Sequence, residues 1–189
     1  MKHNELYHAT RKTAWAYILL HVNLNLGMIN ILPDWWGYLM IVTALPVIGE
    51  EEESANLLTP LGIFLTVIEV VNWLNECLFA SSLPLYLISI VSGAISLYFH
   101  FQFFTNLAAI AKRYGCREEA AIMKLRTVNT VLKTAAIVCS SLQTDHPFMT
   151  GLLILLVIAA IFICRVLFSF SNSLEEKLSE LSEEVLTND

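Results

Sequence analysis

Several ionisable side chains interrupt the long apolar stretches of this chain. They are Glu69, Lys133, His21 and His100. Such a group within a bilayer costs several kcal/mol unless it is paired or faces water. If the apolar stretches cross a membrane, each of these side chains is therefore a candidate for substrate binding or ion transfer.

Glu69 heads a polar stripe on its predicted helix. Asn72 and Glu76 follow at spacings of three and four residues, which place them on the same helical face. Glu69 and Lys133 could pair across helices, or each could compete with a substrate for the other. Glu69 could also exchange a proton with a nearby histidine. Alternatively, the stripe holds helices together, at about 0.6–2 kcal/mol for each hydrogen bond in lipid.

Further polar residues are predicted around the first helical hairpin. Asn25 lies one turn after His21, and Asp34 directly follows Pro33, where it can cap the next helix. A helix N-terminus also favours a bound anion. The alternatives are a structural role for His21 and His100, and a plain hairpin turn at Asp34. Trp35, Trp36 and Tyr38 suit a membrane–water interface.

No catalytic or metal-binding signature is present. The chain lacks the GxSxG, HExxH, Walker and GxGxxG motifs, so we expect no enzyme activity and no cofactor or metal. The four cysteines form no CxxC pair. They are expected to be buried thiols, with a Cys77–Cys139 disulfide as the alternative.

The composition favours lipid as the surrounding solvent. The chain of 189 residues is 56% hydrophobic and 15% charged, against about 25% charged in soluble domains. The net charge of −6 lies mostly in the C-terminal tail, which leaves no basic face for nucleic acid. We therefore predict an all-α transmembrane bundle of about six spans arranged as three hairpins. The expected spans are 13–31, 35–48, 58–79, 85–111, 117–143 and 148–170.

Two of these spans are the least typical of membrane helices. The second, at 35–48, is short, and the first half of the fifth, at 117–143, is charged. A four-span protein with both helices at the membrane interface is the alternative.

The chain divides into a bundle at 1–172 and an acidic, amphipathic tail at 173–189. Ser173 and Glu176 fit a capping box that would start a separate helix. An apolar stripe follows along this helix, formed by Leu174, Leu178, Leu181 and Val185. The stripe would dock on the bundle, on the membrane surface or on a partner protein.

The basic residues predict the orientation. The turns near 32–34, 80–83 and 144–147 contain no Lys or Arg, and ten of the eleven basic residues belong to the opposite side. Lys133 is the exception. Because short cytoplasmic loops carry an excess of Lys and Arg, we expect both termini in the cytoplasm.

The segment 25–41 contains the run Ile-Leu-Pro-Asp-Trp-Trp-Gly-Tyr at 31–38. It resembles the first hairpin of a family of small polytopic membrane proteins of Firmicutes-type bacteria, whose turn reads I-L-P-D-(F/W)-(I/W)-G-Y. The similarity covers about seventeen residues of the chain. It implies a location in the bacterial plasma membrane and no particular activity.

Two functions fit these observations best. The first is a small-molecule or ion transporter, or a membrane subunit of one, that uses the stripe around Glu69. The second is a non-enzymatic accessory protein that docks a partner through its C-terminal helix, and a homo-oligomer is compatible with either. An intramembrane enzyme is the third and least supported function.

Overall fold

The computed structural model describes residues 2–21, 25–26, 29–30, 33–79, 86–141 and 146–188. Within these ranges the fold is all-helical, as predicted, apart from a minimal antiparallel pairing of two residues with two. The elements are α1 (Lys2–His21), β1 (Asn25–Leu26), β2 (Ile29–Asn30), α2 (Asp34–Glu51), the 3-10 helix η1 (Glu53–Leu58), α3 (Thr59–Phe79), α4 (Tyr86–Arg113), α5 (Glu119–Ser141) and α6 (His146–Asn188).

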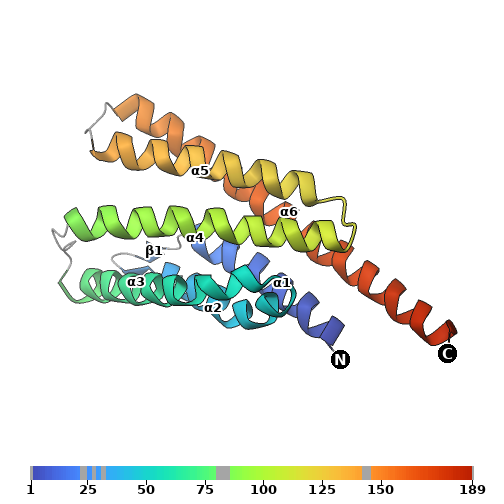
Figure 1. The fold of residues 1–189 in the computed structure, drawn as a ribbon. Coiled ribbons are helices and arrows are strands. Elements are labelled where there is room, and N and C mark those ends of the chain that lie inside the picture. Colours follow the sequence, from blue (N-terminus) through green and yellow to red (C-terminus); the bar gives the residue numbers. More distant parts are fainter. Residues whose placement is uncertain are drawn as a thin grey trace.

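Successive helices run back and forth along the long axis of the molecule. Figure 1 shows both termini and the α4–α5 connection at one end, which also carries η1. We call this the basic end, because Lys112, Arg113 and Arg117 lie there. The opposite end, where α3 and α5 finish and α4 and α6 begin, is called the turn end. This up-and-down course agrees with the predicted hairpins.

Three helical segments are long and apolar enough to cross a membrane. Among the described residues they are Glu53–Asn75, Ile90–Arg113 and Pro147–Glu183. These segments overlap the spans predicted at 58–79, 85–111 and 148–170. The other three helices carry more charge, since α2 has acids at both ends and α5 contains Lys124, Arg126 and Lys133. Six spans therefore remain a prediction.

The first helix differs from its prediction. It begins at Lys2 rather than 13 and ends at His21 rather than 31. Its N-terminal turns form because Leu6 and Ala9 are buried in the core. Beyond His21, two asparagines and a glycine disfavour helix, and Asn25 pairs with Asn30 instead.

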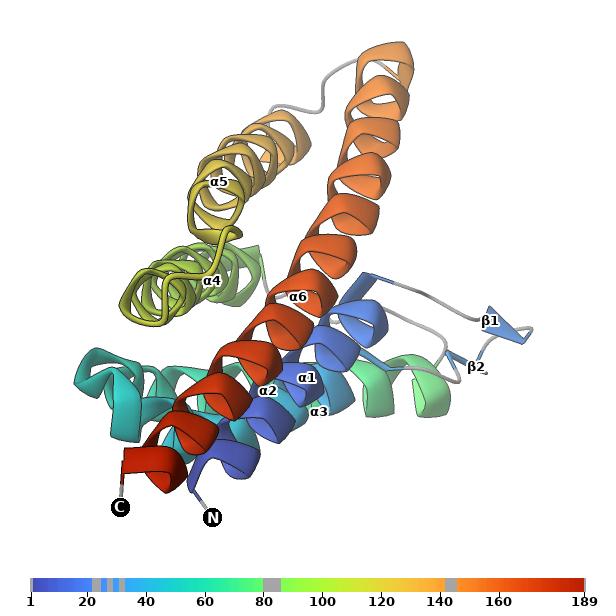
Figure 2. The same ribbon diagram turned by 90° about the vertical axis from the view of Figure 1, so that its right-hand side faces the viewer.

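The last helix is also longer than predicted. α6 continues without a break from His146 to Asn188, so the capping box at Ser173 is wrong. Ser173 Oγ instead donates to Glu118 Oε1 at 3.0 Å. Leu174 and Leu178 are buried in the core cluster, which includes Leu6 of α1. The tail thus packs on its own protein, and α1 and α6 lie side by side in Figure 2.

The start of α2 departs from the predicted helix cap, whereas the end of α4 has a common capping motif. Pro33 occupies the N-cap of α2 without a side-chain capping bond, so Asp34 is the first helical residue and not the predicted cap. At the end of α4, Gly115 has a φ of 65°, and the amide of Cys116 donates to Ala111 O at 2.8 Å. This is a common glycine stop of a helix, with its left-handed residue.

Candidate functional site

A buried group of polar side chains joins α1, α2 and α4. His100 is 1% exposed, and its Nδ1 lies 2.7 Å from Tyr17 Oη. Its Nε2 lies 3.4 Å from Tyr38 Oη, which in turn lies 3.0 Å from Ser96 Oγ. We call Tyr17, Tyr38, Ser96 and His100 the histidine cluster. A neutral imidazole has one N–H, so one phenol donates to the ring and the other accepts from it.

Close approach between helices positions these groups. A Cβ on Gly37 would lie 2.9 Å from Ala16 O and 2.6 Å from Leu20 Cγ, so only glycine allows α1 and α2 to pack this tightly. The contact brings Tyr38, the residue after Gly37, beside the same imidazole as Tyr17. A Cβ on Gly62 would lie 2.5 Å from Val42 Cγ2, and α3 therefore packs equally closely on α2.

Three charged residues lie within electrostatic range of the histidine cluster. Lys133 of α5 interacts electrostatically with Asp34 of α2 and with Glu69 of α3. Both carboxylates also interact with Tyr38, and Lys133 interacts with His21 and His100. We call Asp34, Glu69 and Lys133 the charged layer. The fold thus brings together Glu69, Lys133, His100 and Asp34 from four different helices.

The remaining predicted site residues are placed differently. His21 stacks on Tyr17 with ring centroids 5.9 Å apart, and its Nδ1 lies 2.8 Å from Tyr17 O. Asn25 belongs to the β1–β2 pairing. Asn72 is exposed on the outer surface of α3, and the side chain of Glu76 lies outside what the structure describes. Of the described side chains of the stripe predicted on α3, Glu69 alone belongs to the charged layer.

Sequence reasoning missed three members of the histidine cluster. Tyr17 and Ser96 were not singled out, and Tyr38 was expected at the membrane interface, yet it is 6% exposed. Trp36, by contrast, is 52% exposed. A signal was present in the spacing, because Tyr17 and His21, like Ser96 and His100, lie four residues apart on one helical face.

A second buried polar group lies at the basic end. Glu118 Oε1 accepts hydrogen bonds from Ser169 at 2.7 Å, Ser173 at 3.0 Å and Arg117 at 3.0 Å. Burial alone would raise the pKa of Glu118, but these hydrogen bonds outweigh it and hold the pKa below its ordinary value. Glu118 therefore fastens the start of α5 to α6.

Neighbouring contacts fasten α2 to α4. Arg113 pairs with Glu51 at 3.3 Å, and Tyr114 Oη donates to Glu51 Oε2 at 3.0 Å. Burial and the adjacent carboxylate raise the pKa of Tyr114 to about 12. Both groups at the basic end are explained by helix packing.

Within the described part of the chain, no three His, Cys, Asp or Glu side chains are grouped to hold a metal ion. All four cysteines are thiols, so Cys77 and Cys139 are not joined in a disulfide. Comparison with family models, with curated proteins and with solved structures found no match to this chain.

Proposed function

We propose that this protein is a membrane transport protein, or the membrane subunit of one, that moves protons, alone or coupled to a small solute. The observation that carries the proposal is the convergence of ionisable side chains at one depth. Counted along the helices from the basic end, Glu69, His100 and Lys133 lie about 15–21 Å in, at 1.5 Å per residue. The hydrocarbon core of a bilayer is about 30 Å thick, so this depth is close to its centre.

The chemistry of these groups suits proton transfer. His100 sits between two phenols, so a proton accepted at one ring nitrogen can be released from the other as the hydrogen bonds of Tyr17 and Tyr38 reverse. Glu69 provides a carboxylate acceptor, and Lys133 offsets its charge. Ionisable side chains near a bilayer centre are costly, and apolar residues would pack there more cheaply. The presence of Glu69, His100 and Lys133 together at this depth therefore favours a functional role over a purely structural one.

The C-terminal helix gives less support to the accessory-protein alternative. Its apolar stripe is largely occupied within the chain, because Leu174 is fully buried and Leu178 is 3% exposed. Among the described residues of the stripe, only Leu181, at 43%, presents an apolar side chain to a partner. The excess of Lys and Arg supports a cytoplasmic position for the basic end, and the hairpin resemblance supports a bacterial plasma membrane.

The proposal is tested with the full chain reconstituted in liposomes. An internal pH dye reports proton entry driven by a valinomycin-induced potassium diffusion potential. We expect Glu69→Gln and Lys133→Met to slow entry by on the order of tenfold or more, since each removes a charge at mid-membrane. Glu175→Gln, the same change on the exposed tail, should have no effect.

Two outcomes would contradict the proposal. One is a wild-type chain that admits protons no faster than empty liposomes. The other is normal proton entry in folded Glu69→Gln and Lys133→Met variants, which would leave these residues a purely structural role.

A further inference from the structure

Burial is distributed unevenly along the molecule. On α4, Phe99, Phe103, Phe104 and Leu107 are at most 1% exposed, whereas no described residue from 88 to 98 is buried. On α5, no described side chain beyond Asn129 is buried. On α6, Leu152 is the one buried residue between 147 and 158. On α4, α5 and α6 the half nearer the basic end is therefore densely packed, and the described part of the half nearer the turn end is not.

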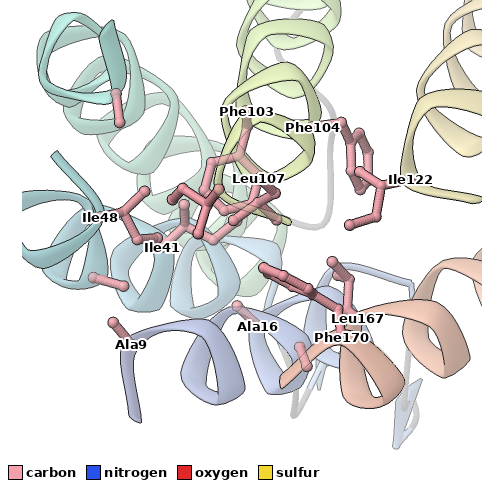
Figure 3. Packing of buried hydrophobic residues seen from close by; sticks show 14 of the residues in the cluster. Ala9, Ala16, Ile41, Ile48, Phe103, Phe104, Leu107, Ile122, Leu167 and Phe170 are labelled. Atoms are coloured by element: carbon pink, nitrogen blue, oxygen red, sulfur yellow. The ribbon is translucent and has the colours of Figure 1, made fainter. Parts of the chain in front are cut away.

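The border between the two halves is built from aromatic rings. Phe99 stacks on Phe103 with centroids 6.2 Å apart and an interplanar angle of 2°. Tyr17 contacts Phe103 at 6.1 Å and Phe104 at 5.2 Å. We call Tyr17, Phe99, Phe103 and Phe104 the aromatic layer. Figure 3 shows Phe103 directed toward the side chains of α2 and Phe104 toward Ile122 of α5.

Polar groups continue on both sides of this layer. On the turn-end side of Phe103 and Phe104 lie His100 and the charged layer, and Asp34 is the first residue of α2 there. Toward the basic end, Asn106 is hydrogen-bonded to Ser54 at 2.8 Å, and Ser54 donates to Glu52 Oε1 at 3.1 Å. Asn106 lies six residues beyond His100, or about 9 Å along α4. On the same helix, Gln102 Nε2 lies 2.9 Å from Asn106 Oδ1, and the buried rings of Phe103 and Phe104 come between His100 and Asn106 in the sequence.

The turn end is built differently. Figure 1 shows α5 and the beginning of α6 diverging from the layer of α1, α2 and α3 toward this end. Apolar side chains exposed along α6 there, such as Leu153 and Val157, suit lipid contact. Toward this end, no described side chains form a densely buried zone equivalent to the aromatic layer.

We infer that the aromatic layer is the gate of the transport path, closed in this conformation, and that the half-buried charged layer is reached by water from the turn end. This inference rests on the proposed transport function. An apolar zone of this kind blocks protons and ions because a charge within it would lose its hydration without gaining polar partners. Opening toward the basic end requires Phe103 and Phe104 to leave the space between His100 and Asn106.

Cysteine labelling tests from which end the site is reached. The full chain with Lys133→Cys is placed in membrane vesicles of either orientation and treated with a charged, membrane-impermeant maleimide. Rates are corrected for the parent chain, which has its four native cysteines. We expect labelling at least about tenfold faster from the turn end, given the cost of burying a charged reagent in the closed zone. Glu175→Cys identifies the basic end, and the outward-facing Val131→Cys gives the rate for a lipid-exposed position of α5.

A second experiment opens the gate. Phe103→Ala should add labelling of Lys133→Cys from the basic end and speed proton entry into liposomes. Phe103→Leu preserves more of the packing, so its effects on labelling and on proton entry should be weaker. It replaces the alanine variant in the test if that variant does not fold. Phe162→Ala is the matched control, because Phe162 is 53% exposed on α6.

The outcomes separate the two ideas. Equal labelling from both ends, or folded Phe103 variants that change neither labelling nor proton entry, would overturn the gate and leave the proposed function standing. Labelling no faster than at Val131→Cys from either end would overturn both, since no aqueous route would then reach the charged layer.

Discussion

The hydrogen bond between Tyr17 and His100 gives a quantitative test of how the helices are held together. Tyr17→Phe removes one hydroxyl and leaves His100 Nδ1 without that partner, while the ring contacts with Phe103 and Phe104 stay. Interhelical hydrogen bonds in membranes average about 0.6 kcal/mol and reach about 1.7. A buried group left unsatisfied costs about 1–3 kcal/mol.

The geometry places Tyr17 at the upper end of the membrane range. The bond is 2.7 Å long, and the two side chains are 0% and 1% exposed, so neither water nor lipid can replace the lost partner. We therefore expect a loss of about 1.5 kcal/mol, or roughly a tenfold shift in the unfolding equilibrium. Tyr38→Phe should cost less at His100, because the contact between the Tyr38 hydroxyl and His100 Nε2 is 3.4 Å long, near the limit of a hydrogen bond.

Equilibrium unfolding in mixed micelles, with sodium dodecyl sulfate as denaturant and tryptophan fluorescence as signal, measures the difference. Tyr98→Phe is the matched control on α4, where the side chain is 54% exposed, and should stay within about 0.5 kcal/mol of wild type. Removing both polar partners in Tyr17→Phe with His100→Leu should recover part of the loss. A Tyr17→Phe chain as stable as the Tyr98→Phe control would refute the assigned bond.

Two further predictions concern the region near the basic end. Because the pKa of Glu118 is lowered on folding, its carboxylate stabilises the fold above its ordinary value of 4.5 and loses this effect as the pH falls below it. Glu118→Gln should therefore lower the thermal midpoint at pH 7, with a difference from wild type that shrinks on acidification. Leu178→Ala should cost about 2–4 kcal/mol by urea titration of the micellar protein, since Leu178 is 3% exposed, and Leu181→Ala less than about 0.5. Equal effects of the two leucine variants would argue against docking of the tail on α1.

Local patterns predicted much of the helical course. The lengths of the apolar runs predicted six spans, and three of these overlap the helices that could cross a membrane, because run length depends only on neighbouring residues. The same reasoning failed at Ser173, where a local capping signature predicts a helix start but burial of Phe170 and Leu174 in the core favours a continuous helix. Glu118, 55 residues away, accepts the Ser173 hydroxyl, and α6 continues through the site.

The prediction that the first helix begins at residue 13 failed for a related reason. The polar segment before residue 13 has no apolar run of its own, and it becomes helical where Leu6 and Ala9 are buried in a cluster that includes Leu174 and Leu178 of the tail. Propensity is a weak guide when tertiary packing supplies most of a helix's stability.

The sequence by itself determined which side chains bring charge and polarity into the apolar helices. Glu69, Lys133 and His100 are evident because each interrupts an apolar run, whatever surrounds it. Only the tertiary structure decided their partners. Tyr17 and Tyr38 meet His100 across 83 and 62 residues, and Glu69 is half-buried whereas Asn72 is exposed. Helix rotation and close approach set these contacts, and both depend on small residues such as Gly37 packing against other helices rather than on any local pattern.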